Sequence, residues 1–121
     1  MERTLRPLKR LIWIGSSKKD LLALPAQVIQ AFGYALHLAQ AGKKHDNAKV
    51  LTGFGDAGVL ELVEDLRGNT YRAVYTVRFS RAVFVLHVFQ KKSKSGIATP
   101  KQVLEVIRDR LKIAKRLAEE K

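Results

Sequence analysis

Three lysines follow a predicted strand in the segment HVFQKKSKSG, residues 87–96. Lys91, Lys92 and Lys94 stand where an apolar run gives way to a loop that contains a glycine. Clustered ammonium groups can bind a phosphate and stabilise negative charge that develops on it. Lysines at strand ends also keep sheet edges from associating with one another. On composition alone both interpretations stay open.

His87 precedes these lysines in the same run. Strict alternation of side chains places His87 on one strand face with Val83, Val85 and Phe89. A half-buried histidine satisfied by a hydrogen bond is the more common case. Because alternation puts Lys91 on that face too, a role for His87 in proton transfer stays open.

The segment GFGDAG, residues 53–58, has the G-x-G-x-x-G spacing of dinucleotide-binding loops. That chemistry needs a strand before the loop and a helix after it, whereas here a polar loop precedes it and a predicted strand follows. We therefore expect a turn and no cofactor. The chain has no cysteine, and its three histidines lack the spacing of metal ligands, so we expect no metal site either.

The chain is strongly basic, with 23 Lys and Arg against 11 Asp and Glu, a net charge of +12 and a pI near 10.3. Such a domain suits a polyanion, because neutralising phosphates releases counterions. Nucleic acid is the favoured partner class, with membrane surfaces and acidic proteins as competitors. No apolar run approaches the roughly 18 residues that span a bilayer, so we expect no membrane insertion.

The apolar patterns predict seven elements. A short strand at 10–15 precedes a helical hairpin, whose first helix has Ser17 as N-cap and whose second runs from Pro25 to Ala41 before Gly42. The next segments are strands at 59–66, 70–79 and 82–92, the first two joined by the turn Arg67-Gly68-Asn69. Thr99 to Gln102 form a capping box that opens a final helix.

The order β-α-α-β-β-β-α predicts a single α+β domain over residues 1–121. Short connections favour an antiparallel meander, which the N-terminal strand joins. We expect the helical hairpin and the C-terminal helix to pack on this sheet and cover one face of it.

This order and three segments resemble the RelE/HigB superfamily of bacterial toxins, in particular its phage-derived, HigB-like branch. The segments are LPAQVIQAFGYALHLAQAG, LELVEDLRGNTYRAVY and the transition HVFQKKSKSG…TP. The resemblance runs from about Trp13 to Lys115 and implies a RelE-like fold. It also implies a cytoplasmic, ribosome-dependent endoribonuclease of a type II toxin–antitoxin system, which uses the RNA's own 2′-hydroxyl and needs no metal or cofactor.

The resemblance assigns roles to individual residues. Arg72 matches the arginine of the family's central strand and is expected to bind the scissile phosphate, with Arg67 nearby. Lys91, Lys92 and Lys94 match basic positions that stabilise the transition state or contact rRNA, and His87 is a candidate proton carrier. Further RNA contacts are expected from other basic residues: Arg78, Lys43, Lys44 and Lys49.

The chain departs from the family where some members carry lysines, in the strand before Arg72. That strand offers Glu61, Glu64 and Asp65 instead. Glu64 is expected to act as general base or to pair with Arg72 across the hairpin.

The partners that the resemblance implies are mRNA and rRNA in the ribosomal A site and a cognate antitoxin, a helix-turn-helix protein. The alternatives are a non-catalytic RNA- or ribosome-binding module and a basic protein-interaction domain.

Overall fold

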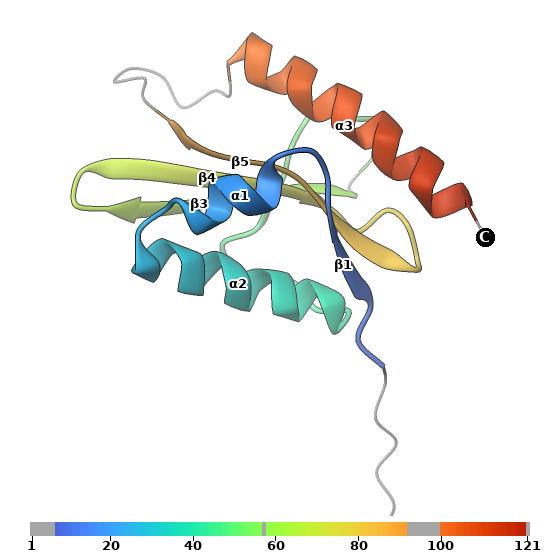
Figure 1. The fold of residues 1–121 in the computed structure, drawn as a ribbon, viewed down its shortest axis with the longest axis horizontal. Coiled ribbons are helices and arrows are strands. Elements are labelled where there is room, and N and C mark those ends of the chain that lie inside the picture. Colours follow the sequence, from blue (N-terminus) through green and yellow to red (C-terminus); the bar gives the residue numbers. More distant parts are fainter. Residues whose placement is uncertain (1–6, 57, 92–99, 121) are drawn as a thin grey trace, which may run out of the picture.

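The computed structural model describes residues 7–56, 58–91 and 100–120 (Figure 1). The elements in the described part of the chain are β1 (Arg10–Trp13), α1 (Ser17–Leu22), α2 (Ala26–Gln40), β2 (Lys49–Val50), β3 (Val59–Leu66), β4 (Asn69–Thr76), β5 (Ala82–Lys91) and α3 (Lys101–Glu119). None of these helices is both long enough and apolar enough to cross a membrane.

The strands form one mixed sheet in the order β1-β5-β4-β3-β2. β3, β4 and β5 make the predicted antiparallel meander, and β1 joins it parallel to β5. The predicted α+β class and element order are confirmed, with β2 added from within the expected polar loop. β2 pairs with only two residues of β3, which explains why its sequence carries so weak a signal.

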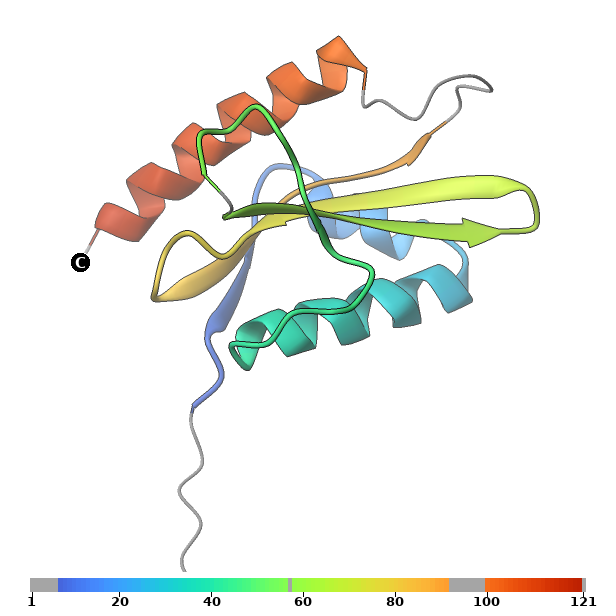
Figure 2. The same ribbon diagram turned by 180° about the vertical axis from the view of Figure 1, so that it is seen from behind.

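α2 and α3 lie on opposite faces of the sheet (Figures 1 and 2). On one face, Phe32 and Leu36 of α2 are buried in a core that includes Tyr75 of β4. On the other face, Ile107 and Leu111 of α3 are buried in a second core that includes Phe84 of β5. The expectation that the helices cover one face is therefore wrong. The burial of β4 fits helices on both faces. Residues 71–76 are all buried, so both faces of this strand are covered.

The helix starts differ slightly from the prediction. α1 has Ser16 as its N-cap, and the hydroxyl of Ser16 donates to Asp20 at 2.7 Å. Ser17 is instead fully buried and donates to the carbonyl of Val85 at 3.2 Å, which ties α1 to β5. Pro100 is the N-cap of α3, and Thr99 of the expected capping box lies outside the described residues.

The β3–β4 hairpin turns on two residues, not three. Leu66 pairs with Asn69, and Arg67 and Gly68 between them have φ of 52° and 84°. Two positive φ values identify a type I′ turn, whose twist matches that of the flanking strands. The side-chain period of a strand is two, so this one-residue change of register reverses which faces meet across the hairpin.

A bulge interrupts the β4–β5 pairing. Val74 pairs with His87, but Tyr75 pairs with Val85, which leaves Leu86 as an extra residue on β5. The single face expected for Val83, Val85, His87 and Phe89 is consequently wrong. Val83 and Val85 belong to the α2 core, whereas His87 stacks on Phe89, which packs against the α3 core.

Candidate functional site

Arg72 lies on the α3 face of the sheet, in the middle of β4. Only 6% of the residue is exposed, and its Nη1 donates to Glu61 Oε1 at 2.9 Å. Glu61 comes from β3, where it pairs with Val74, so it is the diagonal neighbour of Arg72 across the hairpin. The two side chains form a nearly buried ion pair, with 8% and 12% of their areas exposed.

A hollow of about 540 Å³ opens above this ion pair. Lys49 of β2 lines it together with Arg72, so the structure brings two of the predicted RNA-binding residues together. The remaining lining residues are Asp46, Asn47, Glu61, Val63 and Asp65. The hollow thus combines cations with carboxylates, and we call it the Arg72 hollow.

Glu64 does not reach Arg72. The two-residue turn pairs Glu64 with Tyr71 and Arg72 with Val63, so Glu64 belongs to the opposite face. The expected pairing of Glu64 with Arg72 across the hairpin is wrong. A three-residue turn would have set the two residues opposite each other, and the missed partner is Glu61.

Lys91 ends β5 on the same face as Arg72. It pairs with Thr70, and Phe89 pairs with Arg72, so Lys91 and Arg72 are diagonal neighbours, which in antiparallel sheets lie roughly 7–8 Å apart. Lys92 and Lys94, the other two predicted lysines, lie outside the described residues. Arg67 lies at the turn of the β3–β4 hairpin and is exposed.

His87 is held between α1 and α3. Its Nδ1 lies 3.2 Å from Nη1 of Arg110, which also donates to the carbonyl of Leu86 at 3.0 Å. Burial and the charge of Arg110 lower the pKa of His87, while Asp20 opposes them. The neutral imidazole is therefore favoured, and Nδ1 accepts from Arg110. Arg110 is a second residue that the sequence patterns do not single out.

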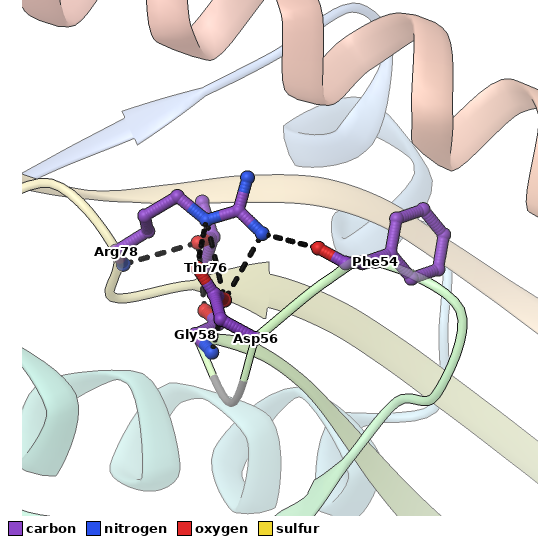
Figure 3. Close-up of polar contacts among 5 residues, drawn as sticks. All are labelled: Phe54, Asp56, Gly58, Thr76 and Arg78. Atoms are coloured by element: carbon purple, nitrogen blue, oxygen red, sulfur yellow. Dashed lines mark hydrogen bonds and ion pairs between the residues drawn. The ribbon is translucent and has the colours of Figure 1, made fainter.

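Arg78 comes two residues after the end of β4, so it lies at the end of the sheet opposite to the β3–β4 turn. It forms an ion pair with Asp56 at 3.0 Å, and its Nη2 donates to the carbonyl of Phe54 at 2.6 Å (Figure 3). Asp56 also accepts from the backbone N–H of Gly58 at 2.8 Å. This bond and Arg78 lower the pKa of Asp56, so the carboxylate stays ionised. The G-x-G-x-x-G segment is followed by β3, as the turn interpretation requires.

Lys43 and Lys44 line a different hollow, of about 410 Å³, which Lys9 and Leu60 share. Leu60 belongs to the α2 core at the start of β3, and it pairs with Tyr75. These lysines therefore lie away from both Arg72 and the turn of the hairpin. The predicted RNA-binding residues are spread over several surfaces rather than gathered in one.

No group of His, Asp and Glu side chains within the described residues could hold a metal ion. Within the Arg72 hollow, Arg72 and Lys49 are cations that could stabilise negative charge, and Glu61, which contacts Arg72, is a carboxylate that could accept a proton.

Comparison with known proteins gives a matching family model and similar solved structures. A family model described as Phage derived protein Gp49-like (DUF891) matches residues 19–112. The crystal structure of the toxin–antitoxin complex RelBE2 from Mycobacterium tuberculosis is similar at 20% sequence identity and a TM-score of 0.46, covering 76% of this chain and 100% of that chain. A search of the curated proteins gives no match.

Proposed function

Because the chain belongs to the Gp49-like family of phage-derived proteins, we propose that it is the toxin of a type II toxin–antitoxin system and cleaves mRNA on the ribosome. The matched residues 19–112 contain the segments that resemble the RelE/HigB toxins. The net charge of +12 supports a polyanionic substrate.

The observation that carries the proposal is the Arg72–Glu61 pair in the Arg72 hollow. RNA cleavage by the adjacent 2′-hydroxyl needs a cation at the phosphate and a base at the hydroxyl. Arg72 and Glu61 supply one of each at 2.9 Å separation. Lys49 lines the same hollow, and Lys91 lies on the same face.

The proposed reaction is an in-line displacement at phosphorus. Glu61 accepts the 2′ proton, the 2′ oxygen forms a bond to phosphorus, and the bond from phosphorus to the 5′ oxygen breaks. The products are a 2′,3′-cyclic phosphate and a 5′-hydroxyl, whose oxygen takes up one proton. Arg72 and Lys91 stabilise the negative charge on the pentavalent phosphate. A water molecule protonates the leaving 5′ oxygen, and Glu61 afterwards releases the 2′ proton to solvent.

A second candidate function is a non-catalytic RNA- or ribosome-binding module. The low exposure of Arg72, 6%, favours it, because an arginine already paired with Glu61 must exchange that partner to bind a phosphate. The partner in either case is proposed to include an antitoxin of the helix-turn-helix class, and for this the resemblance is the support.

The deciding experiment is controlled expression of the parent chain, Arg72→Ala, Lys91→Ala and Glu61→Gln in bacteria, with sequencing of mRNA 5′ ends. We expect growth arrest and cuts at a fixed codon position for the parent. Loss of a general base lowers rates by about 10²–10⁴-fold, so Glu61→Gln should nearly abolish cleavage. Its co-sedimentation with ribosomes should persist, because the substitution removes a negative charge.

Glu64→Gln is the matched control, since it makes the same substitution three residues away on the opposite face. It should cut as the parent does. Circular dichroism of each purified variant separates loss of folding from loss of chemistry. Cleavage that depends on Glu64 and not on Glu61 would reject the site, and a parent that binds ribosomes without cutting would select the second candidate.

A further inference from the structure

A third hollow, of about 310 Å³, opens between α3 and the loop that precedes β3. Four of its lining side chains are cationic: Arg78, Arg108, Lys112 and Lys115. The other lining residues, Gly53, Phe54 and Leu111, carry no charge, so the described lining contains no carboxylate. We call this the α3 hollow.

Two of the cations are held in place by Phe54. Its carbonyl accepts from Nη2 of Arg78 at 2.6 Å, and the guanidinium of Arg108 lies 5.2 Å from the centre of its ring (Figure 3 shows the former contact). Side chains already fixed in position lose less conformational entropy when they bind a ligand. Asp56 offsets part of the charge of Arg78, and the other three cations remain uncompensated within the hollow.

The helix spaces its cations regularly. Lys112 lies about 6 Å along the axis from Arg108, and Lys115 about 4.5 Å further on, at 1.5 Å rise per residue. All three side chains are exposed, and none of them forms an ion pair within the described part of the chain. A row of cations with this spacing suits a ligand with several negative charges in succession.

We propose that the α3 hollow is a second phosphate-binding site, which takes the backbone of a single-stranded RNA. Phe54 and Leu111 are each only 9% exposed, so the hollow offers little apolar surface to anchor an acidic peptide. Arg108 lies over one face of the Phe54 ring, and Phe54 is largely buried, so the ring offers little surface on which a base could stack. The contacts are therefore to phosphates and independent of sequence.

The site deepens the proposed function and rests on it for the identity of the ligand. Arg72 and the core that α3 covers share one face of the sheet, and six residues of extended chain separate Arg72 from Arg78, roughly 20 Å. One RNA strand can thus contact both hollows, with its reacting linkage at Arg72 and a neighbouring stretch at α3.

The test is the salt dependence of binding between a labelled single-stranded RNA and the full chain, without ribosomes. Each lost phosphate contact reduces the slope of log K against log salt by about 0.7 for single strands. The double variant Lys112→Gln/Lys115→Gln should therefore have a slope less steep by roughly 1.4. Fluorescence anisotropy at several salt concentrations measures this slope.

Lys18→Gln/Lys19→Gln is the control, because it removes the same charge from exposed positions on α1. It should keep the parent slope. An equal decrease in both double variants would mean that net charge alone binds RNA and would overturn the proposal. If inorganic phosphate displaced the labelled RNA as effectively as unlabelled RNA does, the site would bind single phosphates, and the proposal of an RNA strand would be overturned. If the Lys112→Gln/Lys115→Gln variant lost binding to polyglutamate but kept binding to RNA, the hollow would be assigned to an acidic protein partner.

These results are independent of cleavage. A chain that never cuts mRNA but shows the expected change of slope keeps the α3 hollow and loses the proposed catalysis. A chain that cuts through Arg72 and shows an unchanged slope loses the α3 hollow alone.

Discussion

Arg67, at the β3–β4 turn, has a strained backbone conformation, with φ of 52° in a residue that is not glycine. A type I′ turn favours Asn followed by Gly, and left-handed backbone costs other residues on the order of 1 kcal/mol. The sequence here has Gly68 but places an arginine before it. A basic side chain at a strained turn is what an RNA contact at this position would require.

Arg67→Asn should accordingly stabilise the fold by about 0.5–1 kcal/mol and weaken RNA binding. Thermal unfolding measures the first effect as a rise in Tm of about 2–5 °C. Arg67→Ala provides the comparison, because alanine removes the charge but gains nothing at positive φ. An equal Tm for the two variants would show that the turn conformation carries no cost.

His87 predicts a pH dependence of stability. Its pKa in the folded chain is lowered, first by burial and then by Arg110, so the unfolded chain binds the proton more readily. The contribution to stability is complete above the unfolded pKa, about 6.5, and is lost as the pH falls from there toward the lowered folded pKa.

Denaturant unfolding at about pH 7.5 and about pH 5.5 should therefore show a smaller loss of stability for His87→Gln than for the parent. Carboxylates also titrate over this range, which is why the difference between the two chains is the quantity to compare. Identical losses would place His87 in solvent in both states.

For Arg72, the sequence correctly predicted which face of the strand the side chain occupies, but not which residue of the neighbouring strand it contacts. Arg72 lies on the strand face opposite Tyr71 and Tyr75, as the alternation of side chains along a strand predicts. The predicted pairing of Arg72 with Glu64 was wrong. The turn is one residue shorter than predicted, and this shift of register moves Glu64 to the face opposite Arg72. Gly68 was the signal in the sequence for the shorter turn, because type I′ turns favour glycine at their second central position.

At the scale of elements, α3 is attached to the β1–α1 connection through Arg110. Its Nη2 donates to Ser16 at 3.3 Å, and a Cβ on Gly15 would lie 2.8 Å from the guanidinium carbon. Gly15 has φ of 58°, a left-handed conformation that glycine adopts without steric cost. The missing Cβ also leaves room for the guanidinium of Arg110.

Gly15→Ala should cost more stability than Gly42→Ala, by up to about 1 kcal/mol, because the end of the Arg110 side chain must shift and weaken its hydrogen bonds to Leu86 and Ser16. Both positions have positive φ, but a Cβ at Gly42 has no atom within 4 Å and adds only the backbone cost. The Gly15→Ala change should also cost less in an Arg110→Ala background, and a double-mutant cycle by denaturant unfolding measures that coupling. Additive effects would show that Arg110 does not depend on the glycine.

The existence of the elements was predictable, since each long helix and strand carries a strong apolar period. The layering was not, because a strand buried on both faces reads as an apolar run whichever helix covers it. The bulge at Leu86 was equally hidden, because an extra residue leaves no mark in an apolar run.

For the whole molecule, the main feature is that its basic side chains are dispersed. The Arg72 hollow, the α3 hollow and the hollow of Lys43 and Lys44 occupy different places on the sheet and helices. This distribution suits a partner that contacts both faces of the sheet, in addition to the single strand proposed for the two hollows of the α3 face.

Ribosome binding should therefore be steeply dependent on salt. With six or more phosphate contacts, affinity should fall by about 10³-fold or more between about 50 and 200 mM monovalent salt. Co-sedimentation across that range gives the slope directly. A nearly flat profile would indicate that apolar protein contacts dominate and would favour the protein-interaction alternative.

The parallel pairing of β1 with β5 joins residues near 10 to residues near 82. During synthesis, β1 emerges long before its partner β5, and the sheet cannot be completed until the last third of the chain has been made. A nascent polypeptide that stops before β5 has neither Lys91 nor the strand that Arg72 pairs with on one side. An unfinished polypeptide of this kind is therefore expected to lack the proposed activity.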